Sequence, residues 1–442
     1  MTNEITSKSR KKPGSEGQAI PSYSWELYSS GQRRIFLFVL FLIGTSNFAD
    51  RNVIGVLLEP IKAEFGVSDA SLGLLSGVSF ALFYATLGLP VAHWADRGDR
   101  RLIITLALGI WTVMTALCGL AQSFWQLVLV RVGVGAGEAG AVPPAQSLIV
   151  DYYSPDRRGR AIGIFMLSST AGYVLGIVIG GWIAEAHGWR AAFLFVGLPG
   201  LVLAILARFV LKEPRHLPQF SVAKRPQESV IRVFRALYLK STYRRIVYGM
   251  VLYYLVAYGA LVFSTSFMMR VHGMTVAEAG ATFGAISAIG AVIGNLLGGN
   301  FADRLAKKDI AWLARLPGWG LLISLPLYEA AFLAPSTWLM GICFFLAGVL
   351  LNGVVPPMYT ALHAVCGSSS RALAVAIALF FANLIGLGLG PVITGLLSDG
   401  LAQTYGPATG LRYALMVVVL MFVPSSFFMF RATRSMPAEV EN

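Results

Sequence analysis

Twelve apolar segments of membrane-crossing length constrain the fold of this 442-residue chain more than any other feature. An α-helix of about 20 apolar residues spans a bilayer, whereas a membrane β-barrel consists of short alternating segments separated by turns. With 56% hydrophobic and 13% charged residues, the chain is also too apolar for an ordinary soluble protein. The sequence therefore predicts an all-α membrane protein with twelve transmembrane helices. The segments cover residues 35–58, 71–94, 102–120, 124–148, 160–184, 190–211, 245–269, 276–301, 311–333, 336–361, 371–397 and 411–430.

The basic residues lie mainly on one side of these predicted spans. Most of the 35 Lys and Arg residues fall in the two tails and in the connections after every second span. The opposite connections hold Lys62, Arg190, Arg270 and Arg412. Because basic loops stay in the cytoplasm, we expect both termini on the cytoplasmic side. This distribution accounts for the net charge of +13, so nucleic acid is not expected as a partner.

A long polar connection separates the sixth predicted span from the seventh. The predicted organisation is a cytoplasmic N-terminal tail (1–34), an N-terminal bundle (35–211), a cytoplasmic linker (212–243), a C-terminal bundle (244–430) and a cytoplasmic tail (431–442). Apolar residues are interspersed with arginines in the second part of the linker, which can therefore form an amphipathic helix at an anionic membrane surface.

The two predicted bundles repeat one another in sequence. Asp96-Arg97 after the second span corresponds to Asp303-Arg304 after the eighth, and two further pairs of motifs have nearly the same separation. These pairs are Pro143-Pro144 with Pro356-Pro357, and Arg160-Ala161 with Arg371-Ala372. Repeated bundles with a substrate site at their interface are the architecture of many secondary transporters.

Four charged residues lie inside two predicted spans, where ionisable side chains are costly and indicate functional sites. Asp50 and Arg51 lie roughly 12 Å below the outer end of the first span, and Arg131 lies roughly 10 Å below the outer end of the fourth. Glu138 follows Arg131 by two helical turns, on nearly the same face and roughly 10 Å deeper. The formal charges sum to zero, as burial in one cavity requires.

We hypothesise that Asp50 is the main proton-accepting group and that Glu138 is its coupled partner. Arg51 would bind an anionic headgroup once a carboxylate is protonated, and Arg131 would orient the carboxylates by bidentate hydrogen bonds. The alternative is a static charge network that only holds the first and fourth spans together.

The matching seventh and tenth spans carry no charged residue at mid-span, but they are rich in aromatic and hydroxyl groups. Candidate cavity residues in these spans are Tyr253, Phe263, Asn352 and Tyr359. Such a wall suits an amphipathic substrate, because it buries an apolar tail and offers hydrogen bonds to a polar head.

The repeated loop motifs predict a gate at the cytoplasmic ends of the two bundles. Asp96, in the Asp96-Arg97 pair, is expected to approach Arg160 and the N-terminus of span eleven, which attracts negative charge. Asp303 and Arg371 are the matching pair in the second half. Such pairs would close the cytoplasmic end while the cavity is open outside.

Several of these motifs resemble those of the major facilitator superfamily. Asp96-Arg97 followed by Arg100-Arg101 is similar to the loop motif between its second and third spans, and residues 131–139 match its R-x-x-x-G-x-G-x-A pattern. The glycines of span five resemble the antiporter motif, with Ile177 where that motif has proline. The resemblance covers essentially the whole chain and implies two pseudo-symmetric six-helix bundles.

Further motifs resemble the Spinster family of lysolipid and sphingosine-1-phosphate transporters. They are residues 47–51, Gly137-Glu138-Ala139, the 147–160 region, Gly388-Leu389-Gly390-Pro391 and Ser398-Asp399. The resemblance implies a bacterial homologue in the inner membrane that works by alternating access and is driven by protons.

The sequence therefore predicts a monomeric, proton-coupled transporter of an amphipathic anionic lipid-like solute, in contact with membrane lipids. The alternatives are a drug/proton exporter or an organic-anion/proton symporter of the same fold, and a transport-dead receptor or scaffold. An enzyme is not predicted, because nucleotide-binding loops and nucleophile–base spacings are missing from the sequence. Cys118, Cys343 and Cys366 lack metal-ligand spacing, so neither a metal nor a cofactor is expected.

Overall fold

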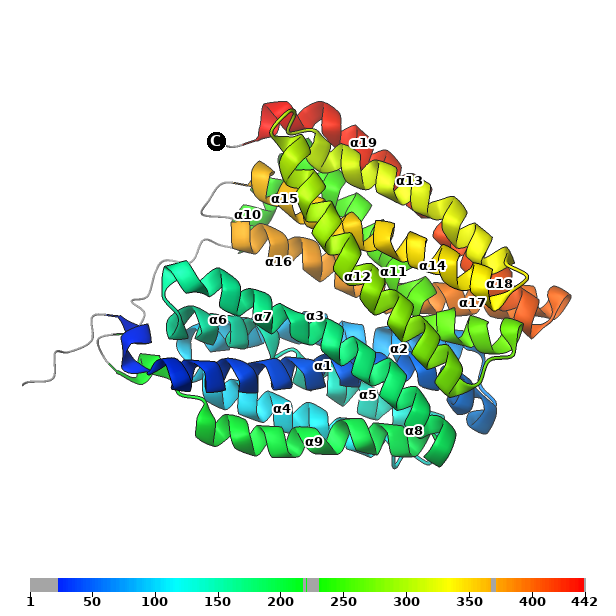
Figure 1. The fold of residues 1–442 in the computed structure, drawn as a ribbon, viewed down its shortest axis with the longest axis horizontal. Helices are drawn as coiled ribbons and strands as arrows, with labels where there is room; N and C mark the ends of the chain where they lie inside the picture. The colour runs from blue at the N-terminus through cyan, green and yellow to red at the C-terminus, as the bar shows by residue number, and fades with distance from the viewer. Residues whose placement is uncertain (1–22, 218–219, 221–229, 367–370, 441–442) are drawn as a thin grey trace, which may run out of the picture.

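The computed structural model describes residues 23–217, 220, 230–366 and 371–440, and this part of the chain is helical with no strand (Figure 1). A short 3₁₀ turn, η1 (Ser24–Leu27), precedes the first half. The first half contains α1 (Ser30–Phe65), α2 (Asp69–Ser76), α3 (Val78–Arg97), α4 (Arg100–Cys118), α5 (Phe124–Glu138), α6 (Val142–Tyr152), α7 (Pro155–Val174), the π-helical η2 (Leu175–Ile179), α8 (Gly180–His187) and α9 (Trp189–Val210).

The second half follows a 3₁₀ turn, η3 (Pro214–His216), and a short linker helix, α10 (Val230–Leu239). It contains α11 (Ser241–His272), α12 (Val276–Ala306), α13 (Trp312–Leu333), α14 (Thr337–Gly353), α15 (Val355–Val365), α16 (Arg371–Phe381), the π-helical η5 (Ala382–Leu387), α17 (Gly388–Tyr405), α18 (Pro407–Val419) and α19 (Phe422–Glu439). Helix α10 buries Val233 and Leu237 and packs against α11 and α16.

Eleven continuous apolar stretches of the described chain are long enough to cross a membrane. The predicted fourth span is divided into α5 and α6 by a turn in which the Gly140 and Ala141 amides donate to carbonyls three residues back. Pro143 and Pro144 follow this turn, and proline both lacks an amide proton and disfavours helix at the residue before it. The same break separates α14 from α15, before Pro356 and Pro357. The predicted fold of twelve spans in two six-helix bundles is confirmed, and within the described residues the fourth and tenth spans are each in two pieces.

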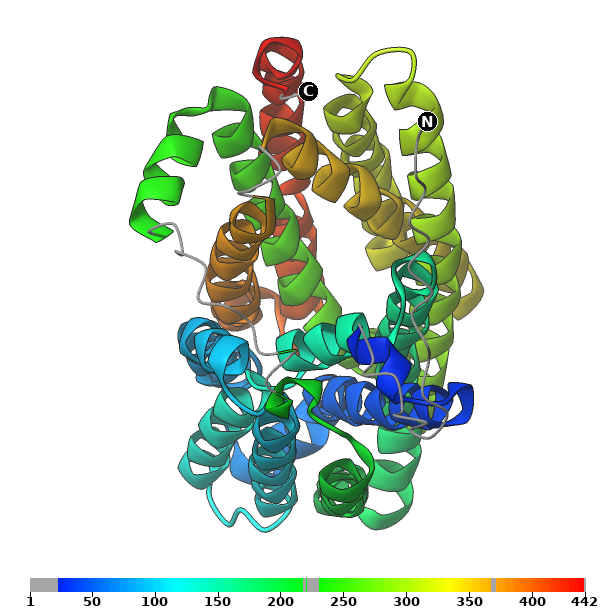
Figure 2. The same cartoon turned by 90° about the vertical axis from the view of Figure 1, so that its left-hand side faces the viewer.

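The two halves meet at the end of the molecule away from the chain termini. Contacts between the halves join α2 to α17, α8 to α12, and α1 to α11. The α2–α17 contact is backbone to backbone, since a Cβ added at Gly73 would overlap the Pro391 carbonyl, and one added at Gly395 would overlap the Asp69 carbonyl. Toward the termini the ribbons of the halves diverge (Figures 1 and 2). We refer to the joined end as the closed end.

Candidate functional site

The site begins at the middle of α1, where Arg51 forms an ion pair with Glu138 at the end of α5. The Arg51 Nε and Nη2 atoms both donate to Glu138 Oε2, at 3.1 and 2.8 Å. The Arg51 side chain is 13% exposed, whereas that of Glu138 is fully buried. Arg51 therefore covers Glu138 and is the member of the pair in contact with the central cavity.

Three aromatic rings surround the Arg51 guanidinium. Its central carbon lies 5.3, 5.0 and 4.5 Å from the ring centroids of Phe48, Phe80 and Tyr84. Cation–π contacts of this kind stabilise a cation that has left water. The guanidinium is thus held by one carboxylate and several ring faces, and its position does not depend on Glu138 alone.

Asp50, the neighbour of Arg51, points away from the cavity. It is fully buried, and adjacent helical residues project about 100° apart. Neither carboxylate oxygen makes a hydrogen bond of good geometry, and the Trp111 and Thr115 side chains on α4 are the donors that interact with it. Arg131 Nη1 donates to the Asp50 backbone carbonyl at 3.3 Å. In this structure the predicted bidentate contact of Arg131 with a carboxylate is therefore replaced by a main-chain contact.

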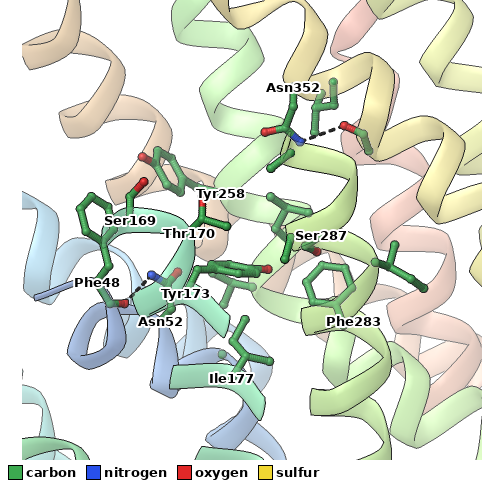
Figure 3. A pocket seen from close by; sticks show the side chains of 18 of the residues that line it. Phe48, Asn52, Ser169, Thr170, Tyr173, Ile177, Tyr258, Phe283, Ser287 and Asn352 are labelled. Carbon is green, nitrogen blue, oxygen red and sulfur yellow. Dashed lines mark hydrogen bonds between the residues drawn. The ribbon is translucent and has the colours of Figure 1, made fainter. Parts of the chain in front are cut away.

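A cavity of about 340 Å³ lies between the halves, and both contribute to its walls (Figure 3). Helices α1 and α7 provide aromatic, amide and hydroxyl groups that face apolar and hydroxyl groups on α11, α12 and α14. The size falls within the range of small-molecule sites. Lining residues include Phe48, Arg51, Asn52, Ser169, Thr170, Tyr173, Tyr258, Phe283, Ser287, Asn295 and Asn352.

Of the four cavity residues predicted in the second half, only Asn352 lines this cavity. Tyr253 and Phe263 are buried inside the second half, and the Tyr253 hydroxyl donates to the Leu351 carbonyl at 3.2 Å. The Tyr359 side chain is partly exposed, and its hydroxyl lies 3.0 Å from that of Tyr254. Tyr253 and Phe263 support the wall in this structure because they are buried inside their own bundle.

Several residues of α1 and α7 share the cavity with Arg51 and were not among the predicted site residues. Phe48, Asn52 and Gly55 line it together with Arg51. This i, i+3, i+4, i+7 spacing is one helix face. The helical spacing of these residues from Arg51 could have predicted the α1 wall from the sequence. Helix α7 carries no charged residue at mid-span from which its cavity face could be inferred in the same way.

The predicted gate residues lie at the end that carries the termini. Asp303 and Arg160 are exposed and form no ion pair within the described part of the chain. The side chains of Asp96, Arg97 and Arg371 lie outside the described residues. The proposed pairing across this end remains a prediction for a state in which the end is closed.

An ion-pair cluster at the closed end joins the halves and was not predicted as a gate. Arg270, at the end of α11, donates to Glu59 of α1 at 2.7 and 3.0 Å and to Asp69 of α2 at 2.6 and 2.7 Å. Lys62 also contacts Asp69, at 2.5 Å. The carboxylate of Asp399 accepts from the first amides of α2, at 2.9 and 2.8 Å. Carboxylates favour this position because the N-terminus of a helix is partly positive.

Arg100 of the predicted loop motif acts within the first half. Its side chain is fully buried and donates to Glu213 from Nε and Nη2, at 3.0 and 2.5 Å. It also pairs with Asp151 at 2.7 Å and donates to Ser147. Arg100 therefore fixes the chain that leaves α9 against α4 and α6.

Two helical bundles around a shared cavity, closed at one end and separated at the other, are the architecture of a secondary membrane transporter. The family model of the Major Facilitator Superfamily matches residues 40–331, and the chain belongs to this superfamily. Its members are transporters rather than enzymes. Within the superfamily, the chain falls in the Spinster family, as the following relatives indicate.

A crystal structure of a bacterial homologue of the human lysosomal transporter Spinster, in an inward-facing and unoccupied conformation, superposes with a TM-score of 0.85. The two sequences are 35% identical, and the match covers 94% of this chain and 100% of that one. An MFS-type efflux pump of Mycolicibacterium smegmatis is 34% identical over 86% of this chain and 88% of its own. Protein spinster homolog 1 of Xenopus tropicalis is 26% identical over 86% of this chain and 76% of its own.

Proposed function

We propose that this transporter couples proton movement to the transport of an amphipathic anion, a lysophospholipid or sphingosine-1-phosphate type of solute. The observation that carries the proposal is the Arg51–Glu138 pair, in which a partly exposed guanidinium at the cavity wall is neutralised by a buried carboxylate. The membrane-embedded charge is then available to substrate only when its carboxylate partner is neutralised.

In the proposed cycle, a proton on Glu138 removes the charge that holds Arg51. The guanidinium remains at the cavity wall through its aromatic contacts and can donate hydrogen bonds to the phosphate or carboxylate of a substrate, for which its planar fork is suited. Asp50 was predicted as the main proton-accepting group, but it is buried beside Arg131 and Glu138 is the carboxylate that pairs with Arg51. We therefore propose Asp50 as the second proton-carrying group. Substrate release and deprotonation of Glu138 restore the ion pair.

The apolar part of the substrate would lie against the aromatic wall formed by Tyr173, Tyr258 and Phe283. We further propose that the end with the termini faces the cytoplasm of a bacterial inner membrane, since the basic residues gather there. The closed end would then face outward. A drug/proton exporter is the second candidate, supported by the similarity to the mycobacterial efflux pump. It would favour cationic solutes, which the Arg51 charge opposes.

Reconstituted protein tests the proposal with fluorescent single-chain lipids that differ only in headgroup charge. A pH gradient should drive movement of the anionic lipid across wild-type vesicles, and Arg51→Gln should abolish it. Glu138→Gln and Asp50→Asn should bind the anionic lipid but lose the dependence on the pH gradient. Arg208→Gln, at an exposed arginine of α9, is the matched control and should behave as wild type. If a pH gradient drove transport equally well in wild type and both carboxylate variants, the proposed coupling would be refuted. A preference for the cationic lipid would favour the exporter.

A further inference from the structure

A groove on the lipid-facing side of the second half contains a carboxylate. The groove runs between α13 and α18 and has a volume of about 640 Å³. Helix α13 lies along the side of the second half remote from the first half (Figure 1), so the groove is separate from the central cavity. Its walls are Leu325, Pro326, Glu329, Tyr413, Met416, Val417 and Leu420.

Glu329 is anomalous among the residues that face the bilayer. It lies one helical turn before Leu333, the last residue of α13, hence roughly 6 Å inside the closed end of that helix. It is partly exposed and makes no hydrogen bond or ion pair within the described part of the chain. An acidic side chain among apolar lipid-facing residues, with no partner in the described part of the chain, indicates a binding function.

The groove is mostly apolar, and the two polar side chains among its lining residues, Glu329 and Tyr413, both lie toward the closed end. Tyr413 lies roughly 9 Å from the start of α18, at the same end of the molecule as Glu329. Met416 and Val417 continue from Tyr413 along one face of α18 toward the middle of the membrane, and Leu420 directly follows this helix. Leu325 lies one turn deeper than Glu329 on α13. A ligand with a cationic head and an extended apolar chain therefore matches the groove.

We propose that this groove binds a phospholipid with an ethanolamine headgroup from the leaflet at the closed end. The primary ammonium donates to the Glu329 carboxylate, and the Tyr413 ring lies at the level of the headgroup, as aromatic residues do at membrane interfaces. One acyl chain lies over Leu325, Met416 and Leu420. A choline headgroup has no N–H to donate, and a phosphoglycerol headgroup adds a negative charge, so the groove discriminates against both.

Native mass spectrometry of the full chain, titrated with ethanolamine, choline and phosphoglycerol lipids of identical acyl chains, tests this assignment. Wild-type protein should bind the ethanolamine lipid about tenfold more tightly than the choline lipid, as a charge-assisted hydrogen bond provides. Glu329→Gln should remove this difference and leave binding of the choline lipid unchanged. Met416→Trp, which fills the apolar part of the groove, should weaken all three lipids.

Glu278→Gln is the matched control, because it removes an exposed acid at the same end of the molecule. Glutamine also serves at this position of the α12 capping box, so the fold is retained. Equal binding of ethanolamine and choline lipids by wild type, or the same loss in both Glu variants, would overturn the proposal. Binding of a single-chain alkylamine in preference to the ethanolamine lipid would assign the groove to cationic amphiphiles instead.

Discussion

Arg270 is the residue whose removal should change the conformational equilibrium most. Its guanidinium makes four hydrogen bonds to Glu59 and Asp69, all between the halves. The Arg270 and Asp69 side chains are 10% and 2% exposed, so the contacts are largely withdrawn from water. They can persist only while the closed end stays closed, because Arg270 belongs to the second half and the two carboxylates belong to the first.

Replacing Arg270 by Gln leaves two carboxylates without their shared cation. Removal of one member of a buried ion pair costs about 3–5 kcal/mol. Lys62 still contacts Asp69, and Glu59 is partly exposed, so we expect a loss of about 2–4 kcal/mol for the closed state. Because 1.4 kcal/mol corresponds to a tenfold change, the equilibrium should move toward opening of this end by about 30-fold to 700-fold.

Distances between spin labels at Gln122 and Gln403, both exposed and near the closed end, measure this shift. The labelled protein should lack the three buried cysteines, Cys118, Cys343 and Cys366. Arg270→Gln should add a population with a longer distance between the labels. Arg190→Gln is the control, since Arg190 pairs with Glu64 inside the first half at the same end. If both variants gave the wild-type distance distribution, the cluster would not hold the closed end together.

Three further predictions concern stability, helix approach and substrate contact. Arg100→Gln should lower the free energy of unfolding by about 3–5 kcal/mol, since Glu213 is left buried without its partner; a chemical denaturation curve measures this, and an unchanged midpoint would contradict it. Gly73→Val should open the closed end, because the side chain would overlap the Pro391 backbone; accessibility of a cysteine introduced at Ser76, which is buried while this end is closed, reports it, and an unreactive thiol would count against it. Tyr258→Ala should weaken binding of the amphipathic anion about tenfold by removing a ring from the cavity wall, whereas Tyr253→Phe, behind the wall, should leave affinity unchanged; equal effects in calorimetric titrations would refute the distinction.

The location of the charged site was accessible from the sequence, but its pairing was not. A charge inside an apolar span is visible in one dimension, and the helical rise gave the approximate depth of Asp50 and Arg131. Which of two adjacent side chains faces the cavity depends on the rotation of α1 about its own axis. That rotation is set by packing against α7 and α9, and it turns Arg51 toward Glu138 and Asp50 toward α4.

The cavity wall in the second half could not be predicted from the sequence for the same reason. Tyr253, Tyr254 and Tyr258 lie within two turns of α11, and their types do not distinguish a residue that lines the cavity from one that supports the wall. Only the assembled bundle makes Tyr258 a lining residue and buries Tyr253 against Leu351.

The sequence by itself determined the fold class, the two-bundle repeat and the superfamily, because hydrophobic length, loop charge and short motifs are local properties of the chain. Only the tertiary structure decided which side chains meet across helices, which end of the molecule is closed, and that Arg270 joins α11 to α1 and α2. These contacts connect residues about 200 positions apart, and they exist only because packing brings the two halves together.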